Sequence, residues 1–465
     1  MMTSTNSHTP LARLLMLGMT ATMLLAACAA PAPAAPAAPA APAAAPAAGE
    51  ATTAPAAEAT TAPAASAGST TIRVSAWESS EALEPWNNAI AAFEKANPDI
   101  KVQLESVPQE YGTKLLAQLA AGTAPDVFQI GDGDVAKYVN KGVVEPLDEY
   151  IAKDKFDTSV FYEGIYKIGQ VNGKTYMLTK DYSPLVLYYN QALFDKANVP
   201  YPKDGWTWQE FLDTAQKLTV KDGDKVTQWG VSLPNTWGDL VWQRGISPFM
   251  YQNEGDFLSP DGKTATGYLN SPATVEALQF YVDLINKHRV APNKTELASL
   301  QGVDLFATGK VAMQWTGRWP IKDYRANKDL KFGTVSLPKG KKAANAICWA
   351  GFAMYAEGKN KDAAWKLMKF IGAEDGAKAF ADYALTAVKS IADSQGLTKD
   401  PQDASIMAGL DLVVAPPEFR QERFGDCVDK AFKENLEKVF ADPTLAIQAS
   451  MDAAAKQADD CLAQP

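Results

Sequence analysis

Strands and helices are predicted to alternate between residues 71 and 130. Three segments have the β-branched and apolar composition of strands, at residues 71–77, 100–107 and 126–130. The segments between them, residues 83–96 and 111–121, place apolar residues at helical spacing. This order is typical of an α/β fold in which helices cover a parallel sheet. Ligands bind such sheets beyond the carboxyl ends of the strands, so the pattern also predicts where a binding site would lie.

The first 69 residues predict export and anchoring rather than a folded domain. Arg13 precedes an apolar run, residues 14–27, that is too short to span a bilayer and ends in small residues, as in an export signal. Leu25-Ala26-Ala27-Cys28 resembles a bacterial lipobox, in which Cys28 is lipidated. Residues 28–69 are almost only Ala, Pro, Thr and Ser, which favours an extended spacer. We therefore expect a lipoprotein signal peptide over 1–27, a lipid-anchored tether over 28–69 and an extracytoplasmic location on a bacterial membrane. The alternative is an ordinary signal with a chance cysteine.

Charge and composition exclude several classes of protein. The formal net charge is −10 at pH 7, which disfavours nucleic acid and, more weakly, a polyanionic ligand. The two histidines are His8, in the leader, and His288, at the end of a predicted helix. One histidine cannot form a histidine-based metal site, so neither metal nor cofactor is expected. No stretch after residue 28 resembles a membrane span.

The cysteines predict one disulfide. If Cys28 carries lipid, Cys348, Cys427 and Cys461 remain. Cys427 begins a helical pattern, residues 426–440, and Cys461 ends a second one, residues 445–462, beyond a break at Asp442-Pro443. Two antiparallel helices of similar length bring these positions together. We expect a Cys427–Cys461 disulfide and a buried thiol at Cys348, with three reduced cysteines as the alternative.

Several segments resemble family 1 extracellular solute-binding proteins, the sugar-binding components of ABC importers, a family that includes maltose-binding protein. Each match is modest alone, and their order is specific. The matching segments lie at residues 74–77, 93–102, 120–126, 142–147, 187–190 with 193–194, 206–211, 306–313 with 317–319, and 363–370. The resemblance implies a periplasmic-binding-protein type II fold, in which two α/β lobes are joined by a hinge that the chain crosses more than once. Ligand would bind between the lobes, which close on it by hinge motion.

Mapped onto this chain, the resemblance places the first lobe at residues 70–181 with 342–388. It places the second at 182–338 with 390–465. It also implies a monomer that captures a mono- or oligosaccharide and delivers it to ABC permease subunits, without enzymatic activity.

Sugar chemistry selects the candidate site residues. Sugars present hydroxyl groups for hydrogen bonds and apolar faces for stacking, so they call for aromatic rings and for Asp, Glu, Asn and Arg side chains. The candidates follow predicted strands or lie at the implied hinge and second lobe. They are Trp77, Glu78, Asp132, Asp134, Asp181, Trp237, Trp242, Arg318, Trp319 and Trp349.

Trp319 is the leading candidate, because an aromatic residue in the Gly-x-Trp turn packs against sugar in the family, and Arg318 beside it could bond hydroxyl groups. The alternative is that Trp319 closes a loop. Asp132 and Asp134 could instead cap the next helix.

The tryptophans have structural alternatives as well. Trp77 could belong to the core, and one of Trp237 and Trp242 is expected to be a core residue. Trp349 is bulky where the family often has small residues, so it either narrows the cleft or is simply buried.

Two other functions stay open. A secreted, lipid-anchored glycoside hydrolase needs two carboxylates across the scissile bond, and no local motif singles out such a pair. A binding protein for a non-sugar polyol such as a glycerol phosphate would call for a Lys/Arg cluster. Arg318 is the only basic residue among the candidates, which favours an uncharged sugar.

Overall fold

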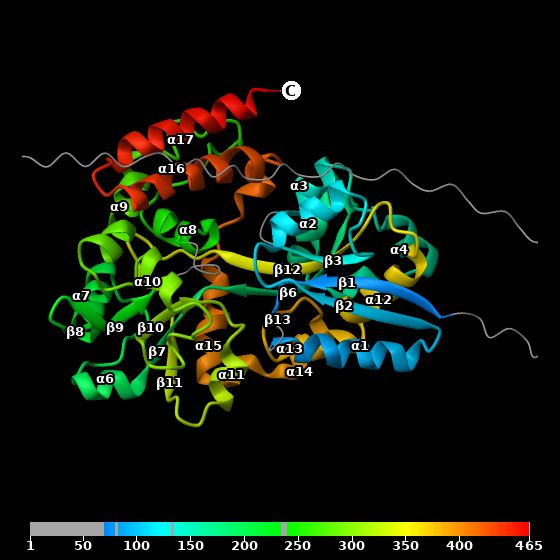
Figure 1. Ribbon diagram of the computed structural model, residues 1–465, viewed down its shortest axis with the longest axis horizontal. Helices are drawn as coiled ribbons and strands as arrows, with labels where there is room; N and C mark the ends of the chain where they lie inside the picture. The colour runs from blue at the N-terminus through cyan, green and yellow to red at the C-terminus, as the bar shows by residue number, and fades with distance from the viewer. Residues whose placement is uncertain (1–68, 80–81, 132–133, 234–239, 465) are drawn as a thin grey trace, which may run out of the picture. The chain divides into compact units, whose positions relative to one another are not determined.

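The computed structural model describes residues 69–79, 82–131, 134–233 and 240–464, with Asp134 described by its backbone alone. These residues belong to one compact unit, residues 66–465. It contains a six-stranded and a five-stranded sheet, here called the first and second sheets (Figure 1). The expected signal peptide, Cys28 and the tether lie outside the described residues.

The first sheet has the strand order β13-β6-β12-β3-β1-β2. β1 lies between β3 and β2 and is parallel to both, as the alternation predicts, whereas β12 runs antiparallel to β3 and β6. The strands are β1 (Thr70–Ala76), β2 (Ile100–Ser106), β3 (Val127–Gly131), β6 (Met177–Pro184), β12 (Ile347–Met354) and β13 (Leu385–Thr386). The predicted α/β architecture of this region is confirmed.

Helices cover both faces of the first sheet. One face packs against α1 (Glu84–Ala96), α12 (Lys361–Ala373) and α13 (Lys378–Ala381), with Trp86 and Phe93 fully buried against Val74. The other face packs against α2 (Tyr111–Ala120) and α3 (Asp134–Asn140). Alternate residues of β1 therefore enter a packed core, and the carboxyl ends of β1 and β3 are held at one edge.

The second sheet has the order β11-β7-β10-β9-β8. Its strands are β7 (Val186–Asn190), β8 (Val220–Asp222), β9 (Lys225–Ser232), β10 (Val311–Thr316) and β11 (Phe332–Val335). The helices around it include α6 (Gln191–Ala197), α7 (Trp208–Leu218), α8 (Gln243–Gln252), α9 (Pro272–Asn286), α10 (Lys294–Ser299) and α11 (Ile321–Ala326). A capping box of Thr207 and Glu210 begins α7, and the Ser271 side chain caps α9.

Two carboxy-terminal helices, α16 (Lys430–Ala441) and α17 (Ile447–Leu462), pack together beside the second sheet. The predicted Cys427–Cys461 disulfide is confirmed, with 5.4 Å between the Cα atoms. Cys348 is buried and, as predicted, takes no part in a disulfide. Cys427 does not begin a regular helix, however, because a π-helical turn, Phe424–Asp429, precedes α16. This wider turn directs Phe424 and Cys427 into the core.

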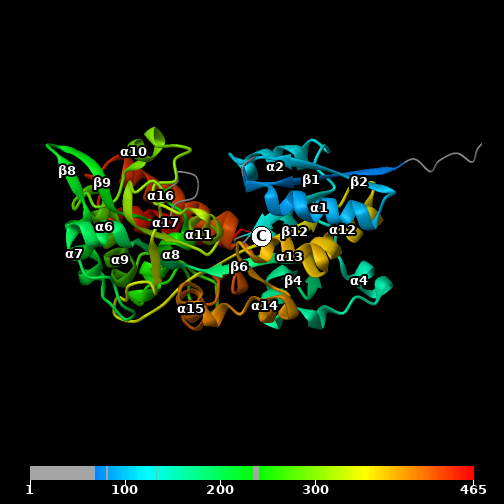
Figure 2. The same ribbon diagram turned by 90° about the horizontal axis from the view of Figure 1, so that it is seen from below.

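Two stretches of chain that connect the sheets meet at Asn345, one after β6 and the other before β12. This buried side chain donates to the carbonyl of Leu185 (2.8 Å) and accepts from the Leu185 amide (3.2 Å), just after β6. Its backbone pairs with Leu412 and Val414. A third passage includes α14 (Lys389–Gln395) and α15 (Pro401–Ala408), which Figure 2 shows near β6. Three separate stretches of chain thus join the sheets, and the proposed lobe boundaries stay a prediction.

Candidate functional site

An acidic cluster lies at the edge of the first sheet. Glu78, just beyond β1, accepts hydrogen bonds from Gln129 Nε2 (3.1 Å) and Trp86 Nε1 (3.0 Å). Lys180 of β6 lies between Glu78 Oε1 (3.0 Å) and Asp181 Oδ2 (3.1 Å). Both carboxylates keep 19% of their side-chain surface exposed, whereas Lys180 keeps 6%. The predicted candidates Glu78 and Asp181 are therefore brought together, with their acid groups partly open to solvent.

Burial and charge act in opposite directions on Lys180. Burial lowers the pKa of Lys180, but the carboxylates of Asp181 and Glu78 outweigh that effect and leave the pKa raised. Burial also raises the pKa of Asp181, which the ammonium group of Lys180 opposes. Lys180 lies over the rings of Trp86 (5.9 Å) and Phe380 (5.1 Å) as well. The buried ammonium group of Lys180 thus holds the carboxylates of Glu78 and Asp181 close together.

Trp77 lies beside this cluster. Its ring meets Tyr111 edge-on, with 5.6 Å between ring centroids, and is half-buried. A Cβ atom at Gly131 would lie 2.3 Å from the Trp349 carbonyl oxygen and 3.1 Å from the Trp77 ring. Glycine at the end of β3 therefore lets β12 and the Trp77 ring approach one another.

Trp319 lies in the turn between β10 and α11 and keeps 39% of its surface exposed. Its indole folds back over Gly317, where a Cβ atom would lie 2.0 Å from the ring. This close approach is a physical reason for glycine in the Gly-x-Trp turn. Trp242, at the start of α8, meets Trp319 edge-on, with 6.4 Å between ring centroids. Two of the predicted tryptophans therefore form one partly exposed aromatic surface.

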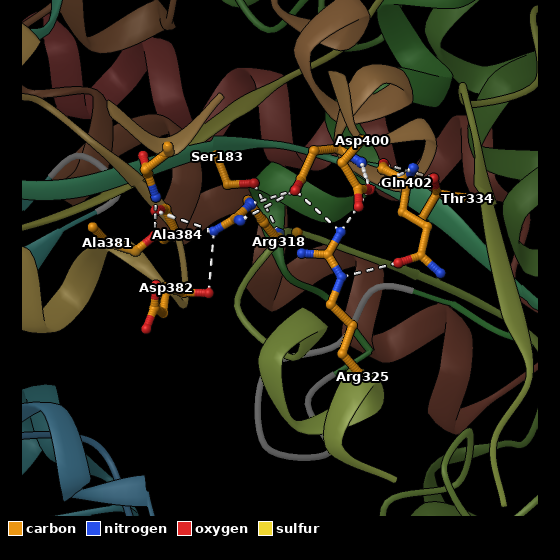
Figure 3. A network of polar contacts seen from close by, with 12 residues as sticks. Ser183, Arg318, Arg325, Thr334, Ala381, Asp382, Ala384, Asp400 and Gln402 are labelled. Atoms are coloured by element: carbon orange, nitrogen blue, oxygen red, sulfur yellow. Dashed lines mark hydrogen bonds and ion pairs between the residues drawn. The ribbon is translucent and has the colours of Figure 1, made fainter. Parts of the chain in front are cut away.

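Arg318, by contrast, is 3% exposed. Figure 3 shows its guanidinium group directed toward Ala381, Asp382 and Ala384. Its Nε donates to Asp403 Oδ1 (2.7 Å), and its Nη1 donates to the carbonyl oxygens of Ala381 (3.2 Å), Asp382 (3.2 Å) and Ala384 (3.4 Å). Its backbone amide donates to Ser183 Oγ (2.9 Å). These contacts occupy the guanidinium group inside the protein and join β10 to α13 and α15. The placement favours a structural role for Arg318 over the sugar contact expected from the sequence.

Trp349, in β12, is 4% exposed and packs under Arg244 of α8, whose guanidinium carbon lies 4.4 Å from the ring centroid. Arg244 Nη2 also donates to Glu418 Oε1 (2.7 Å). Burial raises the pKa of Glu418, and the Arg244 charge opposes the rise. Trp349 lines a cavity of about 450 Å³ together with Glu418, α3 and the segment 164–172. Trp349 is therefore buried and also lines the cavity, so the two roles considered from the sequence do not exclude each other.

Asp132 and Trp237 lie outside the described residues, and the side chain of Asp134 is not described. Across the part of the chain that is described, no helix is both long and apolar enough to cross a bilayer. The same residues contain no group of three or more His, Cys, Asp and Glu side chains arranged to hold a metal ion.

Comparison with known proteins identifies the family. The sequence profile of the bacterial extracellular solute-binding proteins matches residues 76–387. The chain belongs to this family. A Brucella abortus protein named as a binding protein is 30% identical over 311 residues, which is 65% of this chain and 72% of that protein. The galactooligosaccharide-binding protein of Bacillus subtilis is 25% identical over 342 residues, covering 70% and 74% of the two chains.

Solved structures of solute-binding proteins share the fold. The Listeria monocytogenes ABC substrate-binding protein in complex with cycloalternan has a TM-score of 0.74 and 27% identity, covering 85% of this chain and all of that one. UgpB from Mycobacterium tuberculosis, in complex with glycerophosphocholine, has a TM-score of 0.72 and 21% identity, covering 85% and 99%. These neighbours establish that this solute-binding protein has the two-lobed α/β fold, and the first and second sheets are the centres of its lobes.

Within that fold, some residues at the site were not predicted. Lys180, Arg244 and Glu418 carry the charges beside the candidates, yet none was selected from the sequence. A Lys180-Asp181 pair inside a strand that is otherwise buried was a usable signal, because an ionised side chain there requires a partner. Arg244 and Glu418 are separated by 174 residues, and no local pattern links them.

Proposed function

We propose that this extracytoplasmic solute-binding protein captures an uncharged mono- or oligosaccharide between its lobes and delivers it to the permease subunits of an ABC importer. The observation that carries the proposal is the aromatic surface of Trp319 and Trp242. An exposed indole costs free energy in water and suits the apolar face of a sugar ring. The relatives that bind oligosaccharides support the same ligand class.

The position of Trp319 supports a place at the lobe junction. Arg318, on one side of it, bonds to the carbonyl groups of residues 381–384 of the first lobe. Lys322, on the other side, bonds to Glu84 Oε2 (3.2 Å) and Tyr383 Oη (3.1 Å), also from the first lobe. Trp319 is therefore held between two contacts that reach across the lobes.

Charge favours a neutral ligand over a glycerol phosphate. Three cations beside the candidate residues have a buried or half-buried acidic partner, in the pairs Lys180 with Glu78 and Asp181, Arg244 with Glu418, and Arg318 with Asp403. Residues 80–81, 132–133 and 234–239 contain no Lys or Arg. A phosphate group calls for available cationic donors, which these pairs do not supply. Carboxylates that keep some exposure suit hydroxyl donors instead.

A thermal-shift screen against a panel of neutral sugars, with glycerol 3-phosphate included, tests the ligand class. A ligand that binds only the native state raises the melting temperature, and we expect a neutral sugar to do so. Incubation with labelled oligosaccharide tests the hydrolase alternative, which predicts smaller products. Stabilisation by glycerol 3-phosphate alone, or turnover of the oligosaccharide, would reject the proposal.

Trp319→Ala is the sharpest single variant. We expect it to weaken binding of the selected sugar by roughly 1–3 kcal/mol, the usual scale for a packed aromatic anchor, as measured by calorimetry. Tyr201→Ala is the matched control, because Tyr201 is 38% exposed but packs beside α6, on Tyr189 and Phe194. Unchanged affinity in Trp319→Ala would remove this residue from the site.

We further propose that Cys28 anchors the protein through lipid. The support is the lipobox-like Leu25-Ala26-Ala27-Cys28 and the Ala/Pro-rich stretch behind it. Metabolic labelling with a radioactive fatty acid should label the wild type and not Cys28→Ser. Equal labelling of the two would refute the anchor.

A further inference from the structure

A cavity of about 450 Å³ lies between the two lobes, next to Trp349. The first lobe contributes Val135 and Ala136 of α3 and the segment 164–172, and the second lobe contributes Glu418, Phe419 and Glu422. Its volume is within the range of small-molecule sites. Because both lobes line it, a molecule inside it would contact both at once.

The lining suits a polar, uncharged group. Gln170 and Asn172 offer amide groups, and Trp349 and Phe419 offer aromatic surface. Phe419 keeps 54% of its surface exposed, the largest value among the exposed large apolar side chains of the described residues. Lys167, the cation in the lining, lies 2.6 Å from the carboxylate of Glu163.

Glu418 is the unusual member of this lining. Its side chain is 9% exposed and its Oε1 accepts from Arg244 Nη2. Its Oε2 is buried and has no hydrogen-bond partner among the described residues. An unsatisfied buried carboxylate oxygen is costly, and a hydroxyl donor from a ligand would satisfy it.

Arg244 explains why the charge at this position matters. It is 2% exposed, lies over the Trp349 ring and has Glu418 as its ion-pair partner. Glu418 lines the cavity, and its carboxylate supplies a counter-charge to this guanidinium group. Without this carboxylate, the guanidinium group next to the cavity wall would lose that counter-charge, and guanidinium groups bind phosphate and carboxylate groups strongly.

We propose that this cavity is a subsite for an uncharged, hydroxyl-bearing group of the ligand and that Glu418 is its specificity-determining residue. Glu418 accepts a hydroxyl hydrogen through Oε2 and cancels the charge of Arg244, which excludes anionic groups. The subsite rests on the proposed sugar-binding function. The neutralisation of Arg244 by Glu418, here called masking, does not depend on that function and is tested separately.

The first experiment uses inorganic phosphate as the probe. Glu418→Ala should melt below the wild type, because Arg244 loses its ion pair with Glu418, and added phosphate should raise the melting temperature of the variant in a concentration-dependent way. Sodium chloride at matched ionic strength controls for screening. Glu422→Ala is the matched variant: it also removes an acid from the cavity lining, but from an exposed side chain that has no ion pair with Arg244, so phosphate should not stabilise it.

Two results would overturn the masking role. One is equal stabilisation of wild type and Glu418→Ala by phosphate, and the other is a folded Glu418→Ala that phosphate leaves unchanged. If Glu418→Ala does not fold, Glu418→Gln keeps the side-chain shape, removes the charge and gives the same prediction.

The second experiment measures the affinity of a neutral sugar selected with the wild-type protein. Glu418→Gln should bind it about tenfold more weakly, because a carboxylate acceptor is lost, and Glu422→Ala should bind it like the wild type. Wild-type affinity in Glu418→Gln would refute the subsite. A screen in which no sugar stabilises the wild type refutes the proposed function instead, and the phosphate experiment still stands.

Discussion

Lys180 and Arg318 are both buried cations near the lobe junction, yet their surroundings differ. The acidic partners of Lys180, Glu78 and Asp181, keep 19% of their side-chain surface exposed. The partner of Arg318, Asp403, keeps 3%, and backbone carbonyl groups take further donors of Arg318. The two cations are thus buried to a similar extent, and the clusters differ in how exposed the acidic partners are. A partly exposed carboxylate can accept a hydrogen bond from a ligand hydroxyl group, whereas a fully buried one stabilises the fold.

This difference assigns separate roles to the clusters. Arg318 joins the end of β10 to the first lobe at residues 381–384 and to α15, so one guanidinium group holds three segments of the chain together. Lys180 instead fixes two acids at the carboxyl end of β1, where ligands of such sheets bind. The comparison therefore predicts a loss of stability in one cluster and a loss of binding in the other.

Arg318→Ala is expected to have the largest effect on stability. Removing one partner of a buried ion pair typically costs about 3–5 kcal/mol, and here the buried Asp403 would lose its closer cation and keep the less buried Arg325. Urea unfolding followed by circular dichroism measures the change. Arg325→Ala is the control, since Arg325 also bonds to Asp403 but is 34% exposed, and we expect at most about 1 kcal/mol there. Normal stability combined with lost sugar affinity in Arg318→Ala would instead identify Arg318 as a ligand residue.

Lys180→Met is expected to have a smaller, pH-dependent effect on stability, of about 1–3 kcal/mol near neutral pH. Burial already raises the pKa of Asp181, and loss of Lys180 raises it further. A carboxyl group whose pKa is higher in the folded state destabilises the fold at high pH, and that cost shrinks as pH falls through the folded-state pKa. The deficit relative to wild type should therefore decrease from pH 8 to pH 5, as measured by urea unfolding.

Sugar affinity provides a second measurement on the same variant. Protonation of one acid of the pair removes an acceptor, so the affinity of Lys180→Met should fall with decreasing pH while that of the wild type stays flatter. Lys180→Arg keeps the charge and should behave like the wild type. A stability deficit that is constant with pH would contradict the assigned role of Lys180.

The sequence was sufficient for local structure and for one long-range contact. The alternation around β1 to β3 and the Cys427–Cys461 disulfide follow from spacing and composition, and the structure confirms them. The disulfide was predictable because two adjacent helices of similar length constrain each other. Local patterns of this kind report which face of an element is buried.

The charged clusters could not be predicted in the same way. Arg318 and Trp319 are neighbours, yet one is 3% and the other 39% exposed, because the turn sends one side chain inward and the other outward. Arg318 is the buried one because it pairs with Asp403, which is 85 residues away in the sequence. Likewise, the role of Lys180 depends on Glu78, which lies 102 residues earlier. Spacing along the chain does not determine such pairs.

Lys322→Ala is expected to have the smallest effect on stability. It tests whether burial of the ion-pair partners determines how strongly each cluster stabilises the protein. Lys322 also joins the lobes, through Glu84 and Tyr383, and its ammonium group lies 4.5 Å from the Tyr383 ring centroid. Its side chain is 35% exposed and that of Glu84 is 60% exposed, so water screens the pair in both folded and unfolded states. The melting temperature should stay within error of the wild type and of Lys328→Ala, a control that removes a nearby exposed charge. A decrease comparable to that of Arg318→Ala would show that contact between the lobes, rather than burial of the partners, sets the energy of these clusters.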